Sequence, residues 1–129
     1  MKLRIVTPTR VLVNVEVSQV TAPGTAGEMG VLPEHVTFLG QMDTGVVTYE
    51  ESGKRSKVIV RGGYVEVVDD VVTILADDAE FAAETDAIAA RAEVERIRAE
   101  IRHASGSPED MDRLLEQLRL AETRASVAH

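Results

Sequence analysis

The feature that most constrains the fold is a change in hydrophobic period near residue 80. Before it, apolar and β-branched residues alternate with polar ones, as in strands that bury one face. After it, apolar residues recur every three or four positions and Ala, Glu and Arg dominate, which is typical of amphipathic helices. We therefore predict a β domain over residues 1–84 and a helical domain over residues 85–129.

The first part contains several short strand-like runs separated by turn residues. In the clearest run, four valines occupy alternate positions over residues 11–17. Val20 breaks this alternation, which predicts a β-bulge near Ser18. Further strands are expected at 45–50, 57–61, 64–68 and 71–76, each beside Gly, Ser or Asp. Many short strands without an intervening helix favour an antiparallel sandwich or barrel over a parallel α/β sheet.

The second part predicts two helices joined by a short loop. Their apolar stripes are Ala90, Val94, Ile97, Ile101 and Ala104 in the first helix, and Met111, Leu114, Leu115, Leu118, Ala121 and Ala125 in the second. Gly106 is expected to end the first helix, and Ser107 to cap the second ahead of Pro108. Because the stripes are narrow and rich in Ala, the antiparallel pair buries little and could dock in more than one way. A hairpin packed permanently on the β domain is the alternative.

Composition excludes several classes of protein. A net charge of −8 argues against nucleic acid, whose phosphates are neutralised by Lys and Arg. The absence of Cys excludes disulfides and thiolate metal sites. No apolar run approaches the roughly 18 residues that a transmembrane helix needs, and the first residues carry no signal-peptide core. Any contact with a membrane is therefore expected to be peripheral.

Three small groups of residues could carry chemistry but are better explained as turns. They are the glycines Gly24, Gly27 and Gly30, the acidic pairs Asp69–Asp70 and Asp77–Asp78, and His35. No helix follows the glycines to receive a phosphate, so a tight loop with positive φ is the simpler interpretation. The first acidic pair lies in a tight hairpin predicted over residues 67–72, and neither pair has a third metal ligand nearby. We expect no catalytic centre, metal site or cofactor.

Two blocks of sequence resemble a known family. Residues 22–35 read Ala-Pro-Gly-Thr-Ala-Gly-Glu-Met-Gly-Val-Leu-Pro-Glu-His. This stretch resembles the Gly-x-x-Gly-x-(Leu/Met)-Gly-(Ile/Val)-x-Pro-Gly-His signature of the epsilon subunits of F-type ATP synthases. Glu34 replaces the last glycine of that signature, so we expect a turn whose φ Glu tolerates. Residues 61–80 resemble the family's Gly-Gly-x-x-Glu-Val and Val-Thr-(Ile/Val)-Leu-Ala-Asp-x-Ala run, and the resemblance extends over essentially the whole chain.

The resemblance implies an N-terminal sandwich of about ten strands and a C-terminal two-helix hairpin, hence an α+β fold. It implies a rotor subunit without catalytic activity of its own, held against the gamma subunit and the membrane c-ring in the central stalk. The complex would lie on the cytoplasmic face of the bacterial plasma membrane. The loop Gly27–His35 matches the region facing the ring, so Glu28 and His35 are candidate contacts.

The resemblance also implies a regulatory role for the hairpin. In many bacterial relatives it extends along the stalk and its basic residues meet acidic loops of the alpha/beta catalytic assembly, which blocks ATP hydrolysis. The candidates are Arg91, Arg98 and Arg102 on the first helix, with Arg113 and Arg124 on the second. The alternative is a solvated face of intrahelical pairs such as Glu95–Arg98.

Some relatives bind ATP through an (Ile/Leu)-Asp-x-x-Arg-Ala motif. The corresponding stretch keeps Asp86 and Ala90, but Ala89 replaces the arginine and Thr85 the aliphatic residue. We expect weak or no ATP binding. A free-standing adaptor that recruits one protein partner through the hairpin is the second hypothesis for function, and an independent enzyme is the third.

Overall fold

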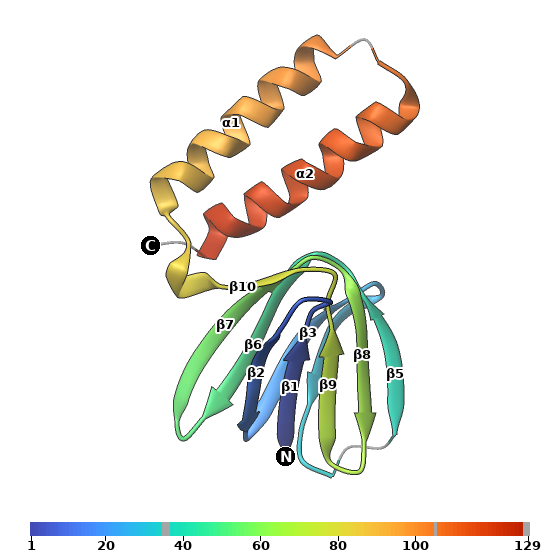
Figure 1. Cartoon of the computed structure of the whole chain (residues 1–129), viewed down its shortest axis with the longest axis vertical. Coiled ribbons are helices and arrows are strands. Elements are labelled where there is room, and N and C mark those ends of the chain that lie inside the picture. Colours follow the sequence, from blue (N-terminus) through green and yellow to red (C-terminus); the bar gives the residue numbers. More distant parts are fainter. Residues whose placement is uncertain (35–36, 105, 128–129) are drawn as a thin grey trace. The chain divides into compact units, whose positions relative to one another are not determined.

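The computed structural model describes residues 1–34, 37–104 and 106–127 (Figure 1). The chain divides into two compact units, Met1–Phe81 and Ala82–His129. The sequence placed this division three residues later, and the difference is a single 3-10 turn, η1 (Ala82–Glu84), which begins the second unit. Each unit is described separately below.

The first unit is a sandwich of ten strands that follow one another without an intervening helix. The strands are β1 (Lys2–Val6), β2 (Val11–Glu16), β3 (Gln19–Gly24), β4 (Gly27–Val31), β5 (Phe38–Met42), β6 (Gly45–Glu51), β7 (Lys54–Val60), β8 (Gly63–Val68), β9 (Val71–Leu75) and β10 (Ala79–Phe81). Their hydrogen-bonded order is β10-β7-β6-β3-β5-β8-β9-β1-β2, with β4 paired to β3. Every pair is antiparallel except β1 with β9. The predicted β-sandwich is confirmed.

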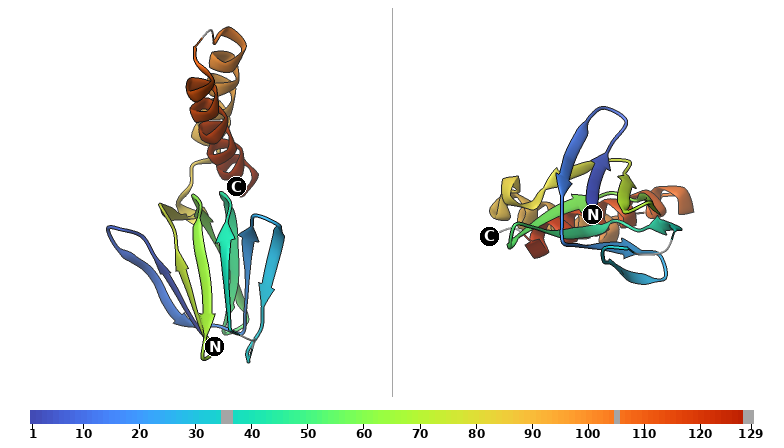
Figure 2. Two further views of the ribbon diagram at one scale, coloured as in Figure 1. Left: turned by 90° about the vertical axis from the view of Figure 1, so that its right-hand side faces the viewer. Right: turned by 90° about the horizontal axis from the view of Figure 1, so that it is seen from below.

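The core of this unit comes from alternate residues of the strands. Ile5 lies opposite Ile74 of β9, which in turn lies opposite Val65 of β8, and all three are fully buried. On β6 and β7, Val47 lies opposite Val58 and both are likewise buried. Each such side chain stabilises the fold by roughly 1.5–3 kcal/mol through its burial. The strands converge toward the end that carries the N-terminus (Figure 2).

The break in alternation near Ser18 has a different cause from the predicted bulge. The chain leaves β2 at Glu16 and starts a new strand, β3, at Gln19. Val17 donates its N–H to Met1 O at 2.8 Å, whereas Ser18 donates to Glu50 O of β6 at 2.8 Å. The bulge is therefore wrong, because the change of parity marks a change of pairing partner from β1 to β6.

Two predicted turns are present as tight hairpins. Val68 pairs with Val71 around Asp69 and Asp70, whose φ values of 49° and 62° fit a two-residue type I′ turn. At the glycine-rich segment, Gly24 pairs with Gly27, and of the three spaced glycines only Gly27 has positive φ, at 125°.

The second unit consists of η1 and two antiparallel helices, α1 (Ala87–His103) and α2 (Pro108–Val127). Its apolar seam contains the buried residues Val94, Ile97 and Ala121, flanked by the half-buried residues Ile101, Leu118 and Ala125. Some predicted stripe residues are not part of it: Leu115 is 49% exposed, Ala104 lies outside the helix, and Ala90, Met111 and Leu114 are outside this cluster.

The helix ends match the prediction in one case only. The Asp110 N–H donates to Ser107 Oγ at 3.2 Å, so Ser107 caps α2 as expected. Gly106 does not end α1, because the helix stops at His103 and Ala104 is already extended, with φ −69° and ψ 134°. The Ala104 N–H donates to Ile101 O at 3.3 Å and so binds one of the last carbonyl groups of the helix.

Candidate functional site

An apolar surface lies on the outside of β5, β8 and β9. Leu39, Tyr64 and Leu75 are 68%, 52% and 51% exposed. Tyr64 pairs with Leu75 across β8 and β9, and with Gln41 across β5 and β8, while Leu39 lies two residues before Gln41 on the same face. We call Leu39, Tyr64 and Leu75 the outer apolar face. A shallow hollow at its edge is lined by Tyr64 and Leu75 together with Val6, Thr7, Pro8, Gly63, Ala76 and Asp77.

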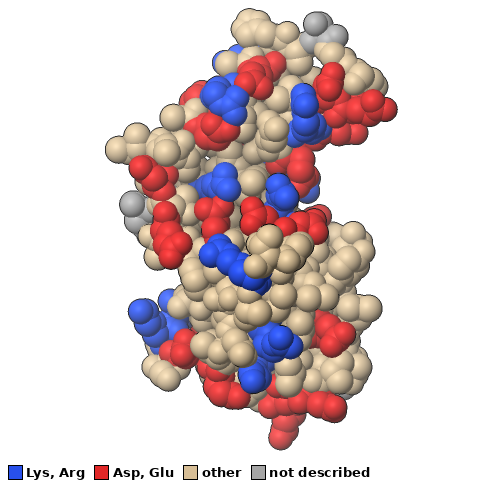
Figure 3. Space-filling view, viewed as in Figure 1, with Lys and Arg blue, Asp and Glu red and all other residues tan. Residues whose placement is uncertain are grey.

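The position of this face follows from strand alternation. Val65 and Ile74, the neighbours of Tyr64 and Leu75 in sequence, are fully buried in the core, so Tyr64 and Leu75 point outward. A solvated sheet face normally carries polar residues at such positions. Adjacent large apolar side chains on a rigid sheet are instead typical of a protein interface. Much of the sandwich surface in view in Figure 3 is uncharged.

Of the two predicted ring-facing residues, Glu28 lies on β4. Residues 27–31 of the expected loop form β4, which pairs with β3 within the described chain, so the expectation of a continuous loop is wrong. Glu28 is exposed and lies opposite Pro23, beside the turn that begins β4. His35 lies outside the described residues.

The turn after β4 adopts a conformation that glycine normally supplies. Glu34 has φ 66°, in the left-handed region, which is allowed for Glu but uncommon for any residue with a Cβ. Its N–H donates to Asp70 Oδ1 at 2.9 Å. This hydrogen bond is the main reason why the pKa of Asp70 is lowered below its usual value. The Met1 ammonium lies 3.5 Å from Asp70 Oδ2 and acts in the same direction.

The five candidate arginines of the hairpin differ in their pairing. Arg98 contacts Glu95 of its own helix and Glu122 of α2, each at 3.3 Å, and Arg113 lies 3.7 Å from Asp110. Arg124 also takes part in an interaction, and its charge helps to lower the pKa of Glu93. Arg91 and Arg102 are exposed and form no ion pair with the residues that the structure describes.

Arg96, which was not among the predicted residues, forms ion pairs with two carboxylates of its own helix. Its guanidinium donates to Glu93 and to Glu100 on the same helix. The hydrogen bonding that Arg96 donates to Glu93 is the main cause that lowers the pKa of Glu93 and the main cause that raises the pKa of Arg96. Glu93 lies three residues before Arg96 and Glu100 four residues after it, and side chains at these spacings are neighbours on a helix. Figure 3 shows acidic and basic side chains interleaved over the helices.

The stretch that resembles a nucleotide motif has a structural role. Asp86 is the N-cap of α1, where its Oδ1 accepts hydrogen bonds from the N–H groups of Ile88 at 2.9 Å and Ala89 at 3.0 Å. Ala90 is buried, and Ala89 supplies no positive charge for a phosphate. The arrangement stabilises the start of α1.

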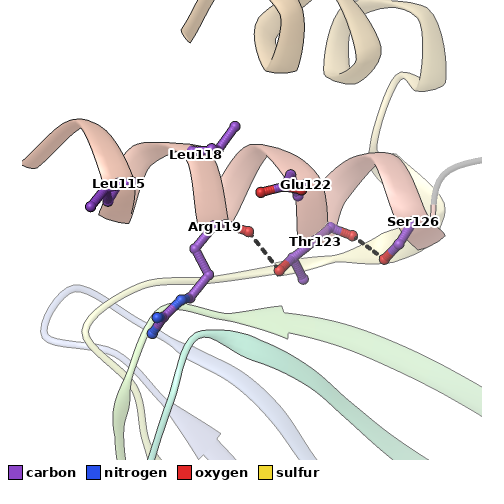
Figure 4. Close-up of a pocket in the computed structure, with 6 residues that line it drawn as sticks. All are labelled: Leu115, Leu118, Arg119, Glu122, Thr123 and Ser126. Atoms are coloured by element: carbon purple, nitrogen blue, oxygen red, sulfur yellow. Dashed lines mark hydrogen bonds between the residues drawn. The ribbon is translucent and has the colours of Figure 1, made fainter. Parts of the chain in front are cut away.

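A second hollow runs along α2. It is lined by Leu115, Leu118, Arg119, Glu122, Thr123 and Ser126 (Figure 4). Thr123 Oγ1 donates to Arg119 O and Ser126 Oγ to Thr123 O, each at 2.7 Å, so both hydroxyls bond to their own helix. Among the described residues, no three His, Asp or Glu side chains gather to hold a metal ion. No helix within residues 1–34, 37–104 and 106–127 has the length and apolarity to cross a membrane.

A rigid sandwich with an outer apolar face, joined to a charged helical hairpin, defines a protein that works through its surfaces within an assembly. The chain belongs to the ATP synthase delta/epsilon family, whose β-sandwich domain model matches residues 1–82. This result confirms the resemblance noted in the sequence, and the fold and the relatives below identify a central-stalk subunit of ATP synthase.

Individual relatives support the same conclusion. The ATP synthase epsilon chain of Pelotomaculum thermopropionicum is 48% identical over 103 residues, which cover 80% of this chain and 75% of that one. The epsilon chain of Solibacter usitatus is 37% identical over 128 residues, covering 99% and 95%.

Solved structures extend the comparison to the whole fold. A chain of the Euglena gracilis mitochondrial ATP synthase, solved by cryo-electron microscopy as OSCP/F1/c-ring in rotational state 1, matches with a TM-score of 0.86 and 26% identity. The match covers 98% of this chain and 80% of that one. Both units of this chain therefore have counterparts in an ATP synthase subunit.

Proposed function

We propose that this subunit transmits rotation between the c-ring and the gamma subunit, and that it performs no catalysis itself. The outer apolar face of Leu39, Tyr64 and Leu75 is the docking surface for gamma in this proposal. The β4 segment, with Glu28 at one end and the turn containing Glu34 at the other, faces the ring. The complex would lie peripherally on the cytoplasmic face of the bacterial plasma membrane.

The single observation that carries this proposal is the outer apolar face on a rigid sheet. The buried core beneath it, including Val65 and Ile74, is close-packed and resists deformation under load. Because the strands fix Tyr64 against Leu75 by backbone pairing, the face does not need to be ordered on binding.

Charge reversal on the face tests this part of the proposal. Tyr64→Glu combined with Leu75→Glu should abolish co-sedimentation of the chain with gamma-containing membranes depleted of their own epsilon subunit. Lys57→Glu is the matched control, because it makes the same change in net charge at an exposed position of β7, which pairs with β6 and β10 and not with β5, β8 or β9. Equal loss in the control, or retention by the double variant, would reject the assignment of the face. If the unaltered chain bound no stalk component, the free-standing adaptor would become the better hypothesis.

We also propose that the hairpin inhibits ATP hydrolysis by the alpha/beta assembly. Arg91 and Arg102 support this role because they are exposed and form no ion pair in the described structure. A guanidinium without a partner can bind a carboxylate of another subunit without first breaking a bond. Arg98, Arg113 and Arg124 would have to exchange partners.

Paired substitutions separate these two groups of arginines. Arg91→Ala with Arg102→Ala should raise ATP hydrolysis by the assembled complex more than Arg98→Ala with Arg113→Ala does. The second pair removes the same formal charge, so a purely electrostatic effect would give equal increases and would contradict the assignment.

A further inference from the structure

The β8–β9 turn places the carboxylate of Asp70 beside a distant segment. Asp69 and Asp70 both adopt left-handed backbone conformations, and the Asp70 carbonyl accepts the N–H of Lys2 at 3.0 Å. The backbone of Asp70 is thereby fixed against β1. Its side chain extends toward the turn after β4, 36 residues earlier in the chain.

The turn after β4 depends on that carboxylate in an unusual way. Glu34 carries a Cβ and still adopts φ 66°, a conformation in which residues other than Gly, Asn and Asp are uncommon. In this conformation the Glu34 N–H donates a hydrogen bond to Asp70 Oδ1 at 2.9 Å. A hydrogen bond to an ionised acceptor is stronger than one between neutral groups, so the contact favours this backbone conformation over its alternatives.

We propose that Asp70 is a positioning residue for the ring-facing turn, holding Glu34 in the left-handed conformation that glycine supplies in the family signature. The consequence for coupling rests on the proposed function, in which this turn faces the c-ring. The proposal covers residues 32–34 together with the β8–β9 turn.

Hydrogen exchange on the isolated full-length chain tests the contact itself. Asp70→Gly removes the carboxylate while leaving the positive φ accessible, and Asp69→Gly makes the same backbone change one residue earlier. We expect exchange of the Glu34 amide to accelerate about tenfold or more in Asp70→Gly and to stay within about twofold in Asp69→Gly. Asp70→Asn keeps an acceptor oxygen and should restore most of the protection. Equal acceleration in both glycine variants would overturn the proposal.

Coupling in the assembled complex tests the consequence. Asp70→Gly should lower the ion pumping obtained per ATP hydrolysed, and adding Glu34→Gly should restore it, because glycine adopts the turn without assistance. If adding Glu34→Gly did not restore the ion pumping obtained per ATP hydrolysed, the positioning role would be contradicted. If the unaltered chain neither bound nor coupled, the proposed function would fail, while the exchange experiment would still decide the role of Asp70.

Discussion

Arg98 of α1 forms an ion pair with Glu122 of α2 across the helical hairpin, with Nη2 and Oε2 3.3 Å apart. Both side chains are about half exposed, so water and salt weaken their attraction. Beneath them, Ile97 is 2% exposed and packs in the seam with Val94 and Ala121. The apolar seam therefore dominates the stability of the hairpin.

We predict that Ile97→Ala destabilises the hairpin by about 2–4 kcal/mol, because it leaves a cavity in a seam that is already narrow. Arg98→Ala should cost no more than about 0.5 kcal/mol. Urea unfolding followed by the helical circular dichroism signal measures both. A larger effect of Arg98→Ala than of Ile97→Ala would show that charge, rather than burial, holds the helices together.

The sandwich should be very sensitive to a methyl group at Gly63. A Cβ there would lie 1.9 Å from Leu75 O, and φ is 112°, so both packing and backbone oppose a side chain. We expect Gly63→Ala to destabilise the fold by at least about 2–4 kcal/mol. Gly30→Ala is the matched control, since nothing lies within 4 Å of its Cβ position. Thermal unfolding of the two variants gives the comparison. Similar melting temperatures would show that Gly63 is not needed for its close approach to Leu75.

Stability should depend on pH through Asp70. Its folded pKa is lowered from 3.8, first by the hydrogen bond from the Glu34 N–H, so the folded state favours the ionised form. The stabilisation is complete above the unfolded pKa and is lost as pH falls through the folded value. The stability advantage of the unaltered chain over Asp70→Asn should therefore be constant near neutrality and shrink in acid. Denaturant titrations across pH measure it, and an advantage that grew in acid would contradict the assignment.

The isolated subunit should not bind ATP appreciably. Asp86 Oδ1 already accepts two N–H groups of α1, and the position of the motif arginine is Ala89. Without that guanidinium, a triphosphate would lack its expected charge partner. Calorimetric titration with ATP should give only the heat of dilution. A micromolar dissociation constant would show that other residues of the hairpin form a nucleotide site.

Local sequence signals predicted most of the regular structure. Alternation bounded by turn residues located β6, β8 and β9 to within a residue at each end, because their β-branched and aromatic residues alternate between buried and more exposed positions. β4 and β5 gave no such signal, since each contains glycine and buries little of its length. The break at Ser18 was misread because a change of partner and a bulge alter the side-chain parity in the same way.

Contacts between distant segments were beyond sequence reasoning. Nothing local to Glu34 indicates that Asp70 would accept its N–H, and nothing local to Arg98 indicates Glu122. The same limit applies to the outer apolar face, whose members come from β5, β8 and β9. By contrast, the Arg96 network has helical spacing and could have been found from the sequence.

The most direct test of the account is ATP hydrolysis by the complex assembled with either the full chain or a chain lacking residues 106–129. Binding to the stalk, measured by co-sedimentation, serves as the control that the sandwich still docks. The account predicts equal binding and a clear rise in hydrolysis on removal of α2. Equal binding with unchanged hydrolysis would contradict inhibition by the hairpin, and loss of binding would contradict docking through the sandwich.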